Sequence, residues 1–97
     1  MVTWSELAKA DLRSIHDLIA SNSPHYAKKI AQDLREKTVI LERLPRIGNK
    51  TPELGDDDIR ELSLHAYRII YQIKGQDIVV LTVVHSRRNF DATGLGQ

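Results

Sequence analysis

Residues 67–84 read YRIIYQIKGQDIVVLTVV and predict a β-hairpin. Apolar and polar residues alternate before the 74–77 turn, and a period of two is typical of a strand. After the turn, residues 78–84 are nearly all apolar, which indicates a strand that is covered on both faces or paired deep in a sheet. Residues 59–64 alternate as well, so we expect three neighbouring strands in an antiparallel meander.

Two amphipathic helices are predicted upstream of these strands. Apolar residues spaced three and four apart over 7–19 indicate the first helix. Ser23 before Pro24 can cap a second helix, which we expect over residues 24–43. With a short strand at residues 1–4, the order is β-α-α-β-β-β. This order predicts an α+β fold, with the N-terminal strand and helical hairpin packed on one face of a small antiparallel sheet.

The chain has the length and composition of one folded domain. Its 97 residues are 41% hydrophobic and 28% charged, which is ordinary for a globular protein. We expect a single domain over residues 1–97. Residues 45–58 lack periodicity and hold Pro, Gly, Asn and acidic residues, which predicts a surface loop. Residues 91–97 contain two glycines and few anchors, and are expected to form a flexible tail.

Composition and motifs argue against several kinds of site and location. The absence of cysteine excludes disulfides and thiolate metal ligands. No apolar run is long enough to span a membrane and no signal peptide is present, so we expect a cytoplasmic protein. The carboxylates of Asp56-Asp57-Asp58 cannot converge on one ion without further ligands, and a solvated acidic run is the favoured interpretation. Neither a metal nor a cofactor is expected.

Arginines are the main candidate functional residues, although the formal net charge is only +1. Arg68 lies on a strand whose other face should be core, so we expect it to point outward toward a partner. Arg60 suits cross-strand pairing and target contact equally well. His85 ends the last strand, where a structural role is favoured over general base catalysis.

The order of these features resembles the RelE/ParE family of bacterial toxins over about residues 2–90. The matching features are Trp4 before the first helix, Ser23-Pro24, Leu44-Pro45 with Gly48, the strand around Arg68, and His85-Ser86-Arg87-Arg88 at the end of the last strand. The resemblance implies a growth-inhibiting toxin. It also implies a cognate ParD-like or RelB-like antitoxin that neutralises the toxin in a hetero-oligomer.

The family has two branches with different targets. RelE-like toxins cleave messenger RNA in the ribosome, and the resemblance would then make Arg60, Arg68, His85 and Arg87 the candidate catalytic residues. Such nucleases usually end this strand with a tyrosine, whereas Phe90 here lacks a hydroxyl.

The form His85-x-Arg87-Arg88 is closer to the ParE branch, which poisons DNA gyrase. On this interpretation, the target or antitoxin contacts are Arg60, Arg68, Arg87 and Arg88. A ribosome-dependent endonuclease and an inactive antitoxin-binding relic remain the alternatives.

Overall fold

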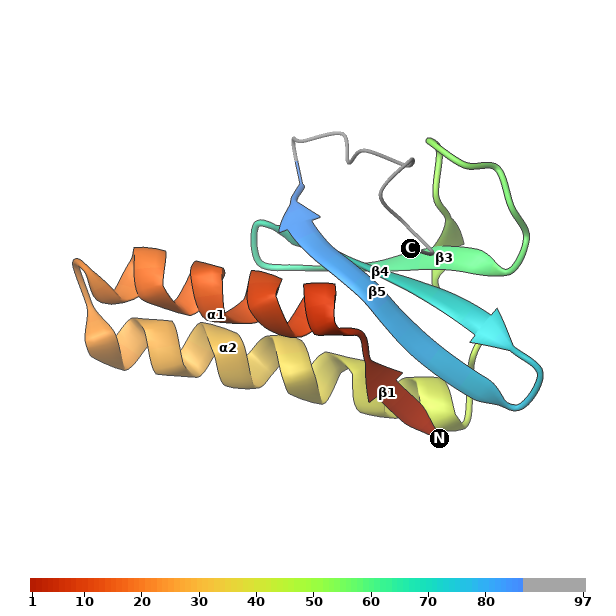
Figure 1. Cartoon of the computed structure of the whole chain (residues 1–97), viewed down its shortest axis with the longest axis horizontal. Helices are drawn as coiled ribbons and strands as arrows, with labels where there is room; N and C mark the ends of the chain where they lie inside the picture. The colour runs from red at the N-terminus through yellow and green to blue at the C-terminus, as the bar shows by residue number, and fades with distance from the viewer. Residues whose placement is uncertain (87–97) are drawn as a thin grey trace.

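Two helices lie against one face of a five-stranded sheet in the computed structural model, which describes residues 1–86 (Figure 1). The helices are α1 (Glu6–Ala20) and α2 (Pro24–Lys37), and a 3₁₀-helix η1 (Thr38–Glu42) follows α2. The strands are β1 (Val2–Trp4), β2 (Asn49–Lys50), β3 (Ile59–Leu64), β4 (Tyr67–Lys74) and β5 (Asp77–His85). Their order across the sheet is β1-β5-β4-β3-β2. No helix in this part of the chain is both long and apolar enough to cross a membrane.

The predicted α+β class is confirmed, and the sheet differs from the expectation at its two edges. The β3-β4-β5 meander is antiparallel, but β1 pairs in parallel with residues 78–80 of β5, so the sheet is mixed. The short strand β2 arises within the predicted 45–58 loop and pairs with β3. A two-residue strand carries no periodic pattern, which is why the sequence did not indicate it.

The second helix ends earlier than predicted. Helix α2 stops at Lys37, and the next five residues form the 3₁₀-helix η1 instead of a continued α-helix. The β-branched residues Thr38, Val39 and Ile40 open this segment, and such side chains are crowded against the preceding helical turn. At the other end, the Ser23 hydroxyl accepts the Tyr26 N–H at 3.3 Å, which confirms the predicted cap.

Strand β5 packs against apolar side chains on both of its faces. This agrees with the prediction, from its apolar sequence, of a strand that is covered on both faces. Val80 belongs to the main core beneath the helices, together with Leu34 and Tyr71. Leu81 belongs to a smaller cluster on the opposite face, where Ile70 is its fully buried neighbour. Part of the predicted loop therefore covers this second face, because Leu54 packs against that cluster.

The buried hydroxyl of Tyr71 fixes the start of the loop to the sheet. Its Oη donates to the Pro45 carbonyl at 2.7 Å and accepts the Gly48 N–H at 3.0 Å. A Cβ at residue 48 would lie 2.5 Å from the Glu61 carbonyl oxygen and 2.6 Å from this hydroxyl, so only glycine fits. Burial raises the pKa of Tyr71, which keeps the hydroxyl protonated as a donor at neutral pH.

We predict that Tyr71→Phe lowers the free energy of unfolding by about 1–3 kcal/mol, because it leaves the part-buried Pro45 carbonyl and the buried Gly48 N–H without their shared partner. Urea unfolding followed by circular dichroism measures the change. Tyr26→Phe is the matched control, because the Tyr26 side chain is half exposed on α2. Equal stability of the two variants would contradict the anchoring role.

A second polar contact joins α2 to the turn between β3 and β4. His65 Nε2 lies 2.9 Å from Asp33 Oδ2, and Lys29 Nζ lies 3.1 Å from the same oxygen. The hydrogen bonds with His65 and then Lys29 hold the pKa of the Asp33 carboxyl below its ordinary value of 3.8. The ionised form is therefore the one that favours the folded state.

We predict that Asp33→Asn lowers the free energy of unfolding by an amount that depends on pH. The pKa of Asp33 is lower in the folded state than in the unfolded state. Its contribution to stability is therefore present above the unfolded-state pKa, and it is lost as the pH falls through the folded-state pKa. At about pH 6, the wild-type protein should unfold at a higher urea concentration than the variant. At about pH 2, the difference between the two midpoints should be smaller. A difference of the same size at both pH values would exclude this linkage.

Candidate functional site

The most enclosed charged group that the structure describes is the guanidinium of Arg68, on the face of the sheet away from the helices. Along β4, Ile69 and Tyr71 point into the main core, while Arg68 and Ile70 point to the opposite face. Only 8% of the Arg68 side chain is exposed. Arg68 therefore points to the face that the sequence predicted, away from the main core. Its guanidinium is nevertheless covered and not open to a partner as expected.

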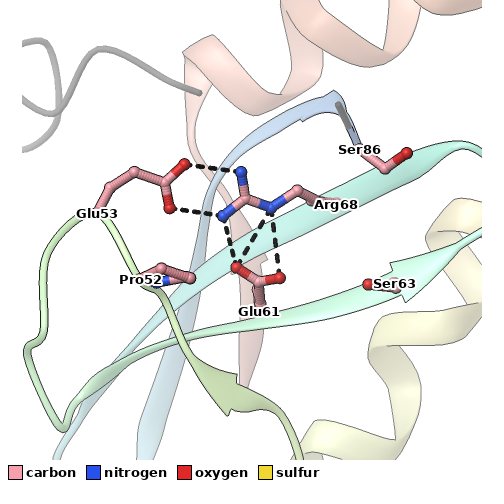
Figure 2. Close-up of a pocket in the computed structure, with 6 residues that line it drawn as sticks. All are labelled: Pro52, Glu53, Glu61, Ser63, Arg68 and Ser86. Carbon is pink, nitrogen blue, oxygen red and sulfur yellow. Dashed lines mark hydrogen bonds and ion pairs between the residues drawn. The ribbon is translucent and has the colours of Figure 1, made fainter. Parts of the chain in front are cut away.

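Two carboxylates of the same chain enclose Arg68, as Figure 2 shows. Glu53, from the loop, binds it through two parallel contacts, Oε2 to Nη1 at 2.8 Å and Oε1 to Nη2 at 2.7 Å. Glu61, on β3, binds Nη2 at 2.6 Å and Nε at 3.2 Å through Oε1. The hydrogen bonds with Glu53 have the largest effect on the pKa of Arg68, followed by those with Glu61. Both raise this pKa above its already high ordinary value, so Arg68 stays charged.

The residues that the structure describes give the hollow beside this cluster a negative charge. Its walls are formed by Pro52, Glu53, Glu61, Ser63, Arg68 and Ser86, and its volume is about 550 Å³. One guanidinium and two carboxylates sum to a formal charge of −1. Glu53 and Glu61 are only 15% and 16% exposed, so water screens this charge weakly. Of the groups within residues 1–86, an incoming phosphate would meet two carboxylates around the Arg68 cation.

Arg60 points to the other face of the sheet and binds the loop. Its backbone partner on β4 is Tyr71, which faces the helices. The guanidinium donates to the Gly48 carbonyl at 2.8 Å and to the Asp57 carbonyl at 3.0 Å, and pairs with the Asp57 carboxylate at 3.0 Å. The structure therefore does not bring Arg60 and Arg68 together.

His85 also lies apart from Arg68. It is the backbone partner of Tyr67, and the two rings meet edge to face with centroids 5.9 Å apart. Tyr67 packs on the main core, whereas the partner of Arg68 is Val84, in the second cluster. His85 and Arg68 thus belong to opposite faces. Arg87, Arg88 and the predicted tail at 91–97 lie outside the described residues.

The acidic run at 56–58 forms ion pairs within the loop. Asp57 contacts Arg46 at 2.9 Å and Lys50 at 3.4 Å, in addition to Arg60. The hydrogen bond with Lys50 and the charges of the two arginines hold the pKa of Asp57 below its ordinary value. Within residues 1–86 no group of three potential ligands is placed to hold a metal ion.

Sequence analysis did not predict that the two glutamates contact Arg68. The sequence held a signal for Glu61, because this residue shares a face with Ile59, two positions earlier, on a strand predicted to pair with β4. Glu53 had none, because it lies in a loop without periodicity. Its contact depends on how the turn at residues 45–48 directs the loop back over the sheet.

Comparison with known proteins agrees with this architecture. The family model described as the ParE toxin of type II toxin-antitoxin system, parDE, matches residues 2–90. The chain belongs to the ParE toxin family. The resemblance predicted from sequence, including its lean toward the ParE branch, is confirmed.

A solved structure described as the chromosomal ParDE TA system from P. aeruginosa contains a chain similar to this ParE-family chain. The two are 26% identical and superpose with a TM-score of 0.74. The match covers 87% of this chain and 92% of that chain. No curated protein matches the sequence.

For this ParE-family chain, we predict that Arg68→Gln lowers the free energy of unfolding by about 3–5 kcal/mol, because two nearly buried carboxylates lose their shared cation. Glu53→Gln should cost less, since Glu61 still pairs with Arg68. Urea unfolding measures both. Arg13→Gln, on the exposed surface of α1, is the control, and an equal effect of Arg68→Gln and Arg13→Gln would refute the prediction.

Proposed function

We propose that this ParE-family toxin inhibits bacterial growth by binding DNA gyrase, and that a cognate ParD-like antitoxin neutralises it. The observation that carries the choice of target is the enclosure of Arg68 by Glu53 and Glu61. The resemblance would make Arg68 the phosphate-binding residue of a nuclease. With its hydrogen-bonding edges already held by carboxylates, Arg68 is poorly suited to that role.

The arrangement of the other candidates also favours binding over RNA cleavage. Cleavage without a metal needs a base, a cation and an acid around one phosphate. Arg60 and His85 belong to the face opposite Arg68. Arg60 lies beside Tyr71 and His85 lies beside Tyr67, and these two tyrosines are four residues apart along β4. That separation is about 13 Å at the usual rise of a strand. This arrangement therefore favours separate roles for these side chains over joint action on one phosphate.

The antitoxin follows from the family. A type II antitoxin uses a segment that folds on its toxin, and such a segment gains affinity from both apolar and charged contacts. We propose the basic end Arg87-Arg88 as a contact for gyrase or antitoxin. Arg60 and Arg68 would contribute indirectly, by holding the loop and the sheet in shape.

We predict that purified toxin inhibits plasmid supercoiling by DNA gyrase, and that replacing both Arg87 and Arg88 by alanine weakens this inhibition by about tenfold or more. Arg13→Ala is the matched control and should inhibit as wild type does. Gel electrophoresis of plasmid topoisomers is the measurement. Supercoiling left untouched at micromolar toxin would exclude gyrase as the target.

The same protein distinguishes the alternatives. Cleavage of messenger RNA by the wild-type toxin in a translating extract would favour the ribosome-dependent nuclease. Overexpression that neither slows growth nor affects either target would favour an inactive antitoxin-binding relic.

A further inference from the structure

Apolar side chains are concentrated at one end of the helical layer, on η1 and the turn that follows it. Val39 is 65% exposed, Leu44 50% and Ile47 49%. The residues Arg43, Leu44, Pro45, Arg46 and Ile47, here called the 43–47 patch, line a shallow hollow of about 430 Å³. The patch follows η1, at the end of the molecule where the N-terminus lies (Figure 1).

The backbone of the patch is held in a fixed shape. The Leu44 N–H donates to the Ile40 carbonyl at 2.9 Å, and the Ile47 N–H donates to the Leu44 carbonyl at 3.1 Å. The Tyr71 hydroxyl fixes Pro45 from inside. A preformed apolar hollow costs little conformational entropy on binding, so it suits a single anchoring side chain of a partner.

The rim of the patch is basic. Arg43 is exposed and forms no ion pair with any residue the structure describes, and the same holds for Arg35 and Lys37 at the end of α2. The neighbouring acid Glu42 is occupied, because it accepts the Val2 N–H at 2.9 Å and lies 3.3 Å from the N-terminal amine. Arg46 is held by Asp57 and Asp58. Arg43 is therefore, among residues 1–86, the cation at the hollow that is available to a partner.

We propose that the 43–47 patch docks an acidic amphipathic segment of the antitoxin, with an apolar side chain in the hollow and a carboxylate on Arg43. This inference rests on the proposed function and adds a site to it. A second copy of this chain fits poorly, because its own patch would place one basic rim against another. A hollow lined by five consecutive residues suits a side chain of a flexible segment better than the flat surface of a large folded target.

The test uses purified toxin and its cognate ParD-like antitoxin, with affinity measured by titration calorimetry. Ile47→Glu and Arg43→Glu should each weaken binding about tenfold or more, through lost apolar contact and through repulsion. The matched controls are Leu18→Glu and Arg13→Glu on α1, whose side chains are also exposed. The controls should bind within about twofold of wild type. Circular dichroism should show that all four variants are folded.

The outcomes separate the two proposals. If the antitoxin fails to bind wild-type toxin, the proposed function fails. If it binds wild type but Ile47→Glu and Arg43→Glu match their controls, the docking site is refuted and the function stands. Loss of gyrase inhibition in these two variants, with antitoxin binding intact, would assign the patch to gyrase and likewise overturn the inference.

Discussion

The hydroxyl of Tyr71 is the contact on which the other features depend. It joins the 45–48 turn to the centre of the sheet, and this turn sets the direction of the loop that follows. The loop then delivers Glu53 to Arg68 on one face of the sheet. The same turn presents Leu44 and Ile47 to solvent at the end of the helical layer. One buried phenol thus supports both a closed charge cluster and an open apolar surface.

Charge enclosure separates the two possible activities of this fold more clearly than any single residue type does. An arginine on a sheet face suits phosphate binding only if its donors are available and its surroundings are not anionic. Here Glu53 and Glu61 supply the acceptors that a phosphate would supply. We therefore propose that the cluster stabilises the folded structure and that partners bind elsewhere on the molecule.

The sequence predicted what depends on periodicity and local capping, and it failed where long-range register decides. Alternation before the 74–77 turn predicted β4, the apolar run at 78–84 predicted β5, and Ser23-Pro24 predicted the start of α2. The separation of Arg60 from Arg68 could not be predicted, because it depends on how β3 and β4 align. Arg60 pairs with Tyr71, so even-numbered residues of β3 share a face with odd-numbered residues of β4.

The parallel pairing of β1 with β5 has a consequence for biosynthesis. Val2 pairs with Ile78, so β1 cannot join the sheet until a strand made much later in the chain is available. Closing so long a loop is entropically costly, and pairing of this kind slows folding. During translation, the nascent chain cannot complete its sheet until β5 has left the ribosomal exit tunnel. A ribosome that stalls before that point releases no completed toxin.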